Sequence, residues 1–218
     1  MFYMMGVIHG DKEGRALLDG WLESAAPDMV TLEFSRYGLN FRRSRGERLM
    51  RKARSAIDEL KAEDSTIDEA ALDALFSYID LPVEFAAASE YCNRRGASLF
   101  LVDMDRFSSS NLARMDEVIA KENLRMLLGV EHSEKRRQKA MARLFFEKGI
   151  KAFGYTEEMR ARDRHMSNKI GRLTRRRIPS RLVHICGWQH LCDPFGFYDA
   201  FYPKKAFIYD KAQGAWAS

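Results

Sequence analysis

The sequence is poor in cysteine and contains no long apolar run. Its three cysteines, Cys92, Cys186 and Cys192, are odd in number and irregularly spaced. A disulfide framework is therefore not expected, and reduced thiols in a cytoplasmic protein are the simpler interpretation. No window approaches the roughly 20 apolar residues that span a bilayer, and no basic segment precedes the apolar N-terminus. We therefore expect a soluble chain without a membrane segment.

Neither sign of charge dominates. The 36 basic and 31 acidic side chains give a formal charge of +5, which permits an anionic partner but does not require one. Basic runs occur at residues 42–54, 135–137 and 175–177, yet acidic residues interrupt or flank them and aromatic residues are sparse there. Solvated helix faces explain these runs better than a nucleic-acid interface, so nucleic acid is not an expected partner.

Low-complexity segments and long internal repeats are absent too, so 218 residues suit one domain with a sizeable core. Helical patterns at residues 12–25 and 83–95 alternate with short apolar runs, which are typical of buried parallel strands. The predicted strands are residues 2–8, 29–34, 98–102 and 181–186, with a further edge strand at 205–209. This alternation predicts an α/β fold with a central, mainly parallel sheet of about four to six strands flanked by helices.

Two long stretches have helical patterns without strands. Residues 41–80 contain two helical segments, the second opened by Ser65 and Thr66, and residues 109–176 contain two or three, with breaks near Gly129 and Gly154. We interpret both stretches as helical insertions of a single domain, residues 1–218. They would pack over the sheet or form a lid beside it.

Polar residues follow each of the four main predicted strands. His9 ends Gly6-Val7-Ile8-His9, Glu33 ends the second strand, Asp103 follows the third, and His190 ends Gly187-Trp188-Gln189-His190. Parallel strands place these groups at one edge of the sheet, where open α/β sheets bind ligands. Two imidazoles and a carboxylate could hold a divalent metal with a position open for water, or a histidine could act as a metal-free general base. The glycine three residues before each histidine would allow a tight turn and close backbone approach to a ligand.

The same segments resemble the TraB/PrgY/Tiki group, within a wider set that includes erythromycin esterases and ChaN-like haem-binding proteins. The resemblance extends from residue 6 to about residue 192. Met104 departs from the arginine that often follows the third-strand aspartate in that group, and Trp188 and Gln189 are bulkier than usual. The segments that carry the resemblance are the two Gly-x-x-His motifs, Pro27 to Glu33 with Arg36, Pro82 to Phe85 with Ala87 and Ala88, Leu101 to Asp103, and Arg162-Asp163 with Met166.

The resemblance implies a hydrolase that cleaves a peptide or ester bond and depends on a metal, as Tiki proteins do. His9, Glu33, Glu84, Asp103 and His190 would be catalytic, and His9, Glu33 and His190 would hold manganese, cobalt or zinc. Arg36 and Arg162 would bind the substrate, although a salt bridge to Glu33 or Asp163 explains each arginine equally well.

The alternative is a protein that uses the same site without catalysis. It would bind haem or an anionic peptide, or act as a regulatory domain, with the aromatic residues between Phe195 and Tyr202 lining an apolar pocket. For the hydrolase, the expected partner is a peptide or small ester substrate. The sequence is compatible with an oligomer.

Overall fold

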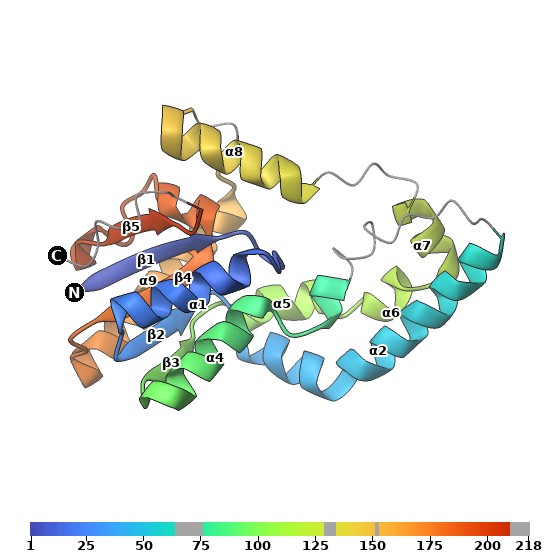
Figure 1. Ribbon diagram of the computed structural model, residues 1–218, viewed down its shortest axis with the longest axis horizontal. Helices are drawn as coiled ribbons and strands as arrows, with labels where there is room; N and C mark the ends of the chain where they lie inside the picture. The colour runs from blue at the N-terminus through green and yellow to red at the C-terminus, as the bar shows by residue number, and fades with distance from the viewer. Residues whose placement is uncertain (64–75, 129–133, 151–152, 210–218) are drawn as a thin grey trace. The chain divides into compact units, whose positions relative to one another are not determined.

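The computed structural model describes residues 1–63, 76–128, 134–150 and 153–209, of which 128 and 134–137 are described by their backbone alone. The chain divides into two compact units (Figure 1). The first comprises Met1–Phe34, Val83–Met104 and Lys135–Ser218, and the second comprises Ser35–Pro82 and Asp105–Glu134. No helix among the described residues combines the length and the hydropathy that crossing a bilayer requires.

A five-stranded, wholly parallel sheet forms the centre of the first unit, in the order β3-β2-β4-β1-β5. The prediction of an α/β fold with a parallel central sheet is confirmed, and each of the five predicted strands corresponds to an observed one. The strands are β1 (Phe2–Val7), β2 (Met29–Leu32), β3 (Ser98–Leu101), β4 (Leu182–Gly187) and β5 (Lys204–Phe207).

The central strands are apolar because helices cover both faces of the sheet. On one face, Phe2 and Met4 of β1 share a core with Met166 and Ile170 of α9 (Glu157–Arg177). On the other face, the ring of Tyr3 packs edge-on against Trp21 of α1 (Gly14–Ala25), with ring centroids 5.7 Å apart. Two further helices, α4 (Val83–Arg95) and α8 (Glu134–Lys148), also belong to this unit apart from the first residue of α8.

The helix ends follow local chemistry. Thr156 caps α9 by accepting a hydrogen bond from the backbone N–H of Met159 at 3.2 Å. The same helix ends at Arg177, and its C-cap residue Ile178 has a φ of 43°, in the left-handed region. Two 3-10 helices, η1 (Trp188–Cys192) and η2 (Asp199–Phe201), separate β4 from β5.

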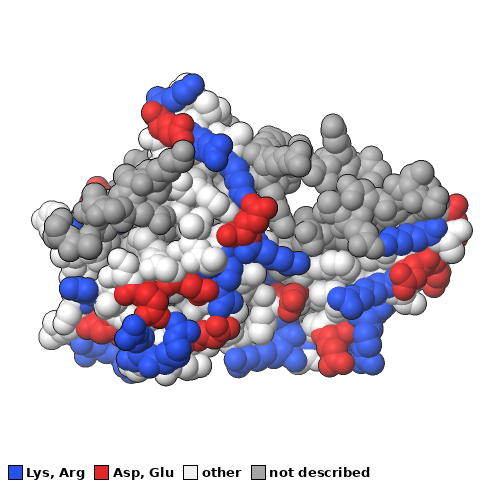
Figure 2. All heavy atoms as spheres, in the orientation of Figure 1, with Lys and Arg blue, Asp and Glu red and all other residues white. Residues whose placement is uncertain are grey.

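The second unit is helical, with α2 (Arg36–Glu63), α5 (Asp105–Leu112), α6 (Met115–Val118) and α7 (Lys121–Leu128). Residues at helical spacing along α2, including Leu49, Ala53 and Ile57, pack in one core with Leu112 and Leu124. Acidic partners accompany the basic side chains of this unit, as in the pairs Arg48–Asp116, Lys52–Asp116 and Lys121–Glu63. Figure 2 shows basic and acidic residues interspersed over the visible face.

The predicted insertions map onto this division in different ways. Residues 41–80 fall within the second unit, but Ser65 and Thr66 lie outside the described residues, as does Gly129. Residues 109–176 are shared between the two units. The prediction of two or three helices there is wrong in number, because α5, α6, α7, α8 and α9 all lie wholly or partly in this stretch. The break at Gly154, between α8 and α9, is present.

Candidate active site

The carboxyl ends of four strands bring polar residues together in the first unit. His9 follows β1, Glu33 follows β2, Asp103 follows β3, and His190 lies in η1 directly after β4. Because the strands are parallel, these ends share one edge of the sheet. Glu84 in the first turn of α4 and Arg162 on α9 complete a connected set of charged side chains.

Glu33 lies at the centre of this set, and its side chain is almost completely buried. Its Oε1 accepts a hydrogen bond from Nη2 of Arg162 at 2.5 Å and lies 3.1 Å from Nε2 of His190. Its Oε2 accepts the backbone N–H of Gly187 at 2.6 Å. Burial raises the pKa of Glu33, but the positive charges of His190, Arg162 and His9 outweigh burial and hold it well below the ordinary value. Glu33 is therefore ionised at neutral pH.

Arg162 joins two of the strand-end carboxylates. Besides Glu33, it binds Asp103 through Nε at 3.1 Å and Nη2 at 2.8 Å, a bidentate arrangement that fixes the plane of the guanidinium. The predicted alternative of a salt bridge between Arg162 and Glu33 is present. The described ion-pair partner of the adjacent Asp163 is His190 and not an arginine. Arg36, the other predicted substrate-binding arginine, is the exposed first residue of α2 and belongs to the second unit.

His190 lies between two buried carboxylates. Its Nδ1 is 2.7 Å from Oδ1 of Asp163, while its Nε2 faces Glu33. Asp163 also accepts hydrogen bonds from the hydroxyls of Tyr198, at 3.0 Å, and Tyr155. Burial lowers the pKa of His190, but the charges of Glu33 and Asp163 and the bonds to them raise it to about 9. The ring is therefore an imidazolium with an N–H toward each carboxylate.

His9 is the solvent-facing member of the set, with 54% of its side chain exposed. Its Nδ1 lies 3.2 Å from Oε1 of Glu84, and the N–H of Gly10 donates to the same oxygen at 3.2 Å. Its Nε2 is 3.6 Å from Oε2 of Glu33, which is too long for a hydrogen bond. Desolvation lowers the pKa of His9, but the negative charge of Glu33 and the hydrogen bond to Glu84 raise it well above the ordinary value.

Glu84 is buried, and only one of its two carboxylate oxygens is satisfied. Oε1 interacts with His9 and Gly10, whereas Oε2 has no hydrogen-bond partner among the described residues. His184, inside β4, shows a similar imbalance: Nδ1 lies 3.1 Å from Oγ1 of Thr31, and Nε2 has no described partner. Burial lowers the pKa of His184 to about 4, so this interior ring is neutral.

The glycines of the two Gly-x-x-His motifs accommodate the opposite motif. A Cβ atom at Gly187 would lie 2.9 Å from Nε2 of His9. A Cβ atom at Gly6 would lie 2.9 Å from Cα of Trp188 and 2.6 Å from Cδ1 of Leu191. Neither glycine has a positive φ. The expectation of a tight turn is therefore wrong, because these glycines permit close packing between the two motifs.

Three residues of this network were not predicted to belong to the site: Asp163, Tyr155 and Tyr198. The position of Asp163 could have been predicted, because Asp163, Met166 and Ile170 follow helical spacing and all lie on the buried face of α9. That spacing marks a buried carboxylate, which requires a partner. The tyrosines carried no comparable signal, since their hydroxyls approach Asp163 only through the fold.

A divalent metal would need several free donor atoms at this site. Among the described residues, no group of three or more His, Cys, Asp or Glu side chains is arranged to hold a metal ion. The oxygens of Glu33 already receive Arg162, His190 and the Gly187 N–H, and the guanidinium supplies the positive charge that this carboxylate needs. In this arrangement the predicted ligands His9, Glu33 and His190 do not fit a divalent metal.

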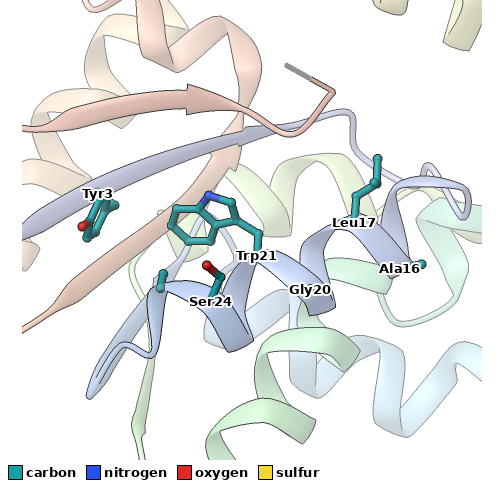
Figure 3. Close-up of a pocket in the computed structure, with 7 residues that line it drawn as sticks. Tyr3, Ala16, Leu17, Gly20, Trp21 and Ser24 are labelled. Atoms are coloured by element: carbon teal, nitrogen blue, oxygen red, sulfur yellow. The ribbon is translucent and has the colours of Figure 1, made fainter. Parts of the chain in front are cut away.

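A pocket of about 180 Å³ lies elsewhere in the first unit (Figure 3). Tyr3 of β1 and Trp21 and Leu17 of α1 are among its lining residues, and none of the charged set contributes to it. Its lining is mainly apolar, so it offers no acid–base chemistry of its own.

Comparison with known proteins does not identify the chain. No family model, curated protein or solved structure matches it, and the resemblance to the TraB/PrgY/Tiki group stays a prediction.

Proposed function

We propose that the protein is a hydrolase that cleaves a peptide or ester bond, with His9 and Glu84 as its catalytic residues. One observation carries this proposal. The exposed imidazole of His9 lies at the edge of a buried network of ion pairs, beside a carboxylate oxygen that has no donor within the part of the chain that the structure describes. Buried networks of this kind, ending in one accessible acid–base group, are characteristic of catalytic sites.

His9 is suited to stabilising negative charge on the substrate. Its Nδ1–H is held by Glu84, and its raised pKa favours the imidazolium at neutral pH. Its Nε2–H has no short bond to Glu33 and can donate to a carbonyl oxygen of the substrate. A fixed donor of this type acts as the charge develops in the transition state, where removing one such donor costs about 100- to 1,000-fold in rate.

Glu84 is suited to activating water. A buried carboxylate oxygen without a donor is unfavourable by roughly 1–3 kcal/mol or more, so a bound water that donates to Oε2 would satisfy it. In the proposed reaction, Glu84 takes a proton from this water as the water oxygen attacks the carbonyl carbon. The bond to the amine or alcohol then breaks, and Glu84 returns the proton to that leaving group.

The buried residues hold this pair in place without touching the substrate. Glu33 lies between the imidazole rings of His9 and His190, and Arg162 ties it to Asp103. These interactions keep the charges fixed before substrate arrives, which is the condition for strong electrostatic catalysis. No step requires a metal, since Arg162 and His190 supply the positive charge.

A panel of activated esters and short peptides tests the proposal on wild-type protein and four variants. We expect His9→Gln and Glu84→Gln each to lower kcat/KM by about 100- to 10,000-fold. The matched controls, His165→Gln on α9 and Glu90→Gln on α4, should retain wild-type rates. Full activity in His9→Gln would overturn the assignment. Binding of haem or an acidic peptide, with no hydrolysis of any compound in the panel, would favour the non-catalytic alternative.

A further inference from the structure

Helix α8 contacts the segments that carry both histidines of the site. We define the first histidine loop as residues 8–13 and the second as Trp188–Cys192. Nζ of Lys139 lies 3.1 Å from Oδ2 of Asp11 and 2.7 Å from Oε2 of Glu13, in the first loop. Asp11 is buried and also accepts hydrogen bonds from the backbone N–H of Glu13, at 3.2 Å, and from the hydroxyl of Tyr209, so this ion pair is anchored to the body of the unit.

The neighbouring residue on α8 reaches the second loop. Oε1 of Gln138 accepts a hydrogen bond from Nε1 of Trp188 at 2.9 Å. Trp188 is nearly fully buried and begins the turn that holds His190. Two consecutive side chains of one helix therefore bind the two histidine loops.

Aromatic packing holds the other end of the same helix. Phe146 stacks on Phe207 of β5 with ring centroids 5.0 Å apart, and Phe145 and Phe146 both lie against Trp188, at 6.2 and 6.3 Å. Gln138, Ala142 and Phe145 follow helical spacing, so one face of α8 makes these contacts. The contacts extend over the ends of three neighbouring strands, β4, β1 and β5.

We infer that α8 is a brace that fixes the two histidine loops relative to each other, with Lys139 and Gln138 as positioning residues for His9 and His190. Its catalytic consequence rests on the proposed function, but the brace itself does not. Each loop is short and lies at a strand end, where backbone order depends on side-chain anchors. A helix that binds both loops couples their order, so loosening one contact loosens both loops.

Amide hydrogen exchange of the intact protein, followed by mass spectrometry, tests this coupling. Lys139→Met keeps the aliphatic stem and removes the ion pair with the first loop. We expect about two- to fivefold faster exchange in both loops, the range that loss of a modest ion pair allows. Lys139→Arg should restore wild-type exchange. Lys148→Met, at an exposed site in the last turn of α8, is the matched control and should change neither loop.

A variant at the other contact tests whether the effect of each substitution reaches both loops. Gln138→Leu removes the hydrogen bond to Trp188, and we expect it to accelerate exchange in the first loop as well as the second. Acceleration confined to the loop next to each substitution, or none in either loop, would overturn the brace. This readout contains no activity measurement, so failure of the hydrolase proposal leaves its outcome interpretable.

Discussion

Nδ1 of His190 lies 2.7 Å from Oδ1 of Asp163, and both side chains are buried. Because Nε2 of the same ring faces Glu33, a neutral imidazole would present a lone pair to one carboxylate. The doubly protonated ring alone satisfies both contacts. Its charge is thus part of the folded state, and the stability of the protein depends on keeping it.

This relationship predicts a loss of stability at alkaline pH. The pKa of His190 is about 9 in the folded protein, against roughly 6.5 in an unfolded chain. Its contribution is therefore complete below about pH 6.5 and is lost as the pH rises through about 9, with a size on the order of 3 kcal/mol. Urea unfolding across this range should show a steeper decline for wild type than for His190→Gln. Equal slopes would contradict the charged state of His190.

The packing of the two motifs predicts that replacing their glycines by alanine has different effects on the stability of the protein. In Gly187→Ala the new methyl group meets the end of the His9 side chain, which can move, so stability should change by less than about 1 kcal/mol while hydrolysis falls. In Gly6→Ala it meets the backbone of Trp188, which should cost about 1–3 kcal/mol of unfolding free energy.

Gly20→Ala provides the control for both, because a Cβ atom there meets no atom within 4 Å and the site is inside α1. We expect this variant to gain up to about 1 kcal/mol from helix propensity. If Gly6→Ala were as stable as Gly20→Ala, the close contact between the motifs would be wrong.

The engagement of Glu33 by Arg162 predicts that metal removal has little effect. After dialysis against a strong chelator, we expect the thermal unfolding midpoint and the rate of ester or peptide hydrolysis to be unchanged. The measurement is metal content by mass spectrometry together with both assays. One equivalent of manganese, cobalt or zinc, bound by wild type and lost in the His9→Ala/His190→Ala double variant, would instead support the metal set that the family resemblance implies.

The end of α9 predicts a stabilising substitution. Ile178 is 82% exposed and has a φ of 43°, a conformation that is strained for a β-branched residue. Ile178→Gly relieves the strain and loses little packing, so the unfolding free energy should rise by about 1 kcal/mol. Ile150→Gly is the matched control, since Ile150 is 50% exposed without a positive φ and should lose stability. Calorimetry that found the opposite order would contradict the strain.

Much of this fold could be predicted because its strands are short apolar runs that end in polar residues. Runs such as residues 2–8 and 181–186 are buried on both sides, and such a pattern occurs in parallel sheets covered by helices. Once the strands are parallel, His9, Glu33, Asp103 and His190 must share an edge. The sequence pattern was therefore sufficient to predict that these four residues lie close together.

Their pairing could not be fixed in the same way. The contact between His9 and Glu84 joins residues 75 positions apart. For Arg162, whose contact with Glu33 joins residues 129 positions apart, the sequence left substrate binding and a salt bridge to Glu33 or Asp163 as alternatives. Which carboxylate each cation binds depends on the order of the strands and on the rotation of α4 and α9. The role of Gly187 could not be predicted for the same reason, because this glycine makes room for His9, which belongs to the other motif.

The position of β1 between β4 and β5 also bears on how the chain acquires its structure. Phe2 pairs with Leu182 and Tyr3 with Lys204, so β1 can meet both of its neighbours only after the ribosome has passed Lys204. Such a high contact order slows folding, and it leaves an apolar strand unpaired while the ribosome extends the chain. Premature termination before β5 would thus expose one side of β1, and nascent fragments of this protein should be clients for chaperones.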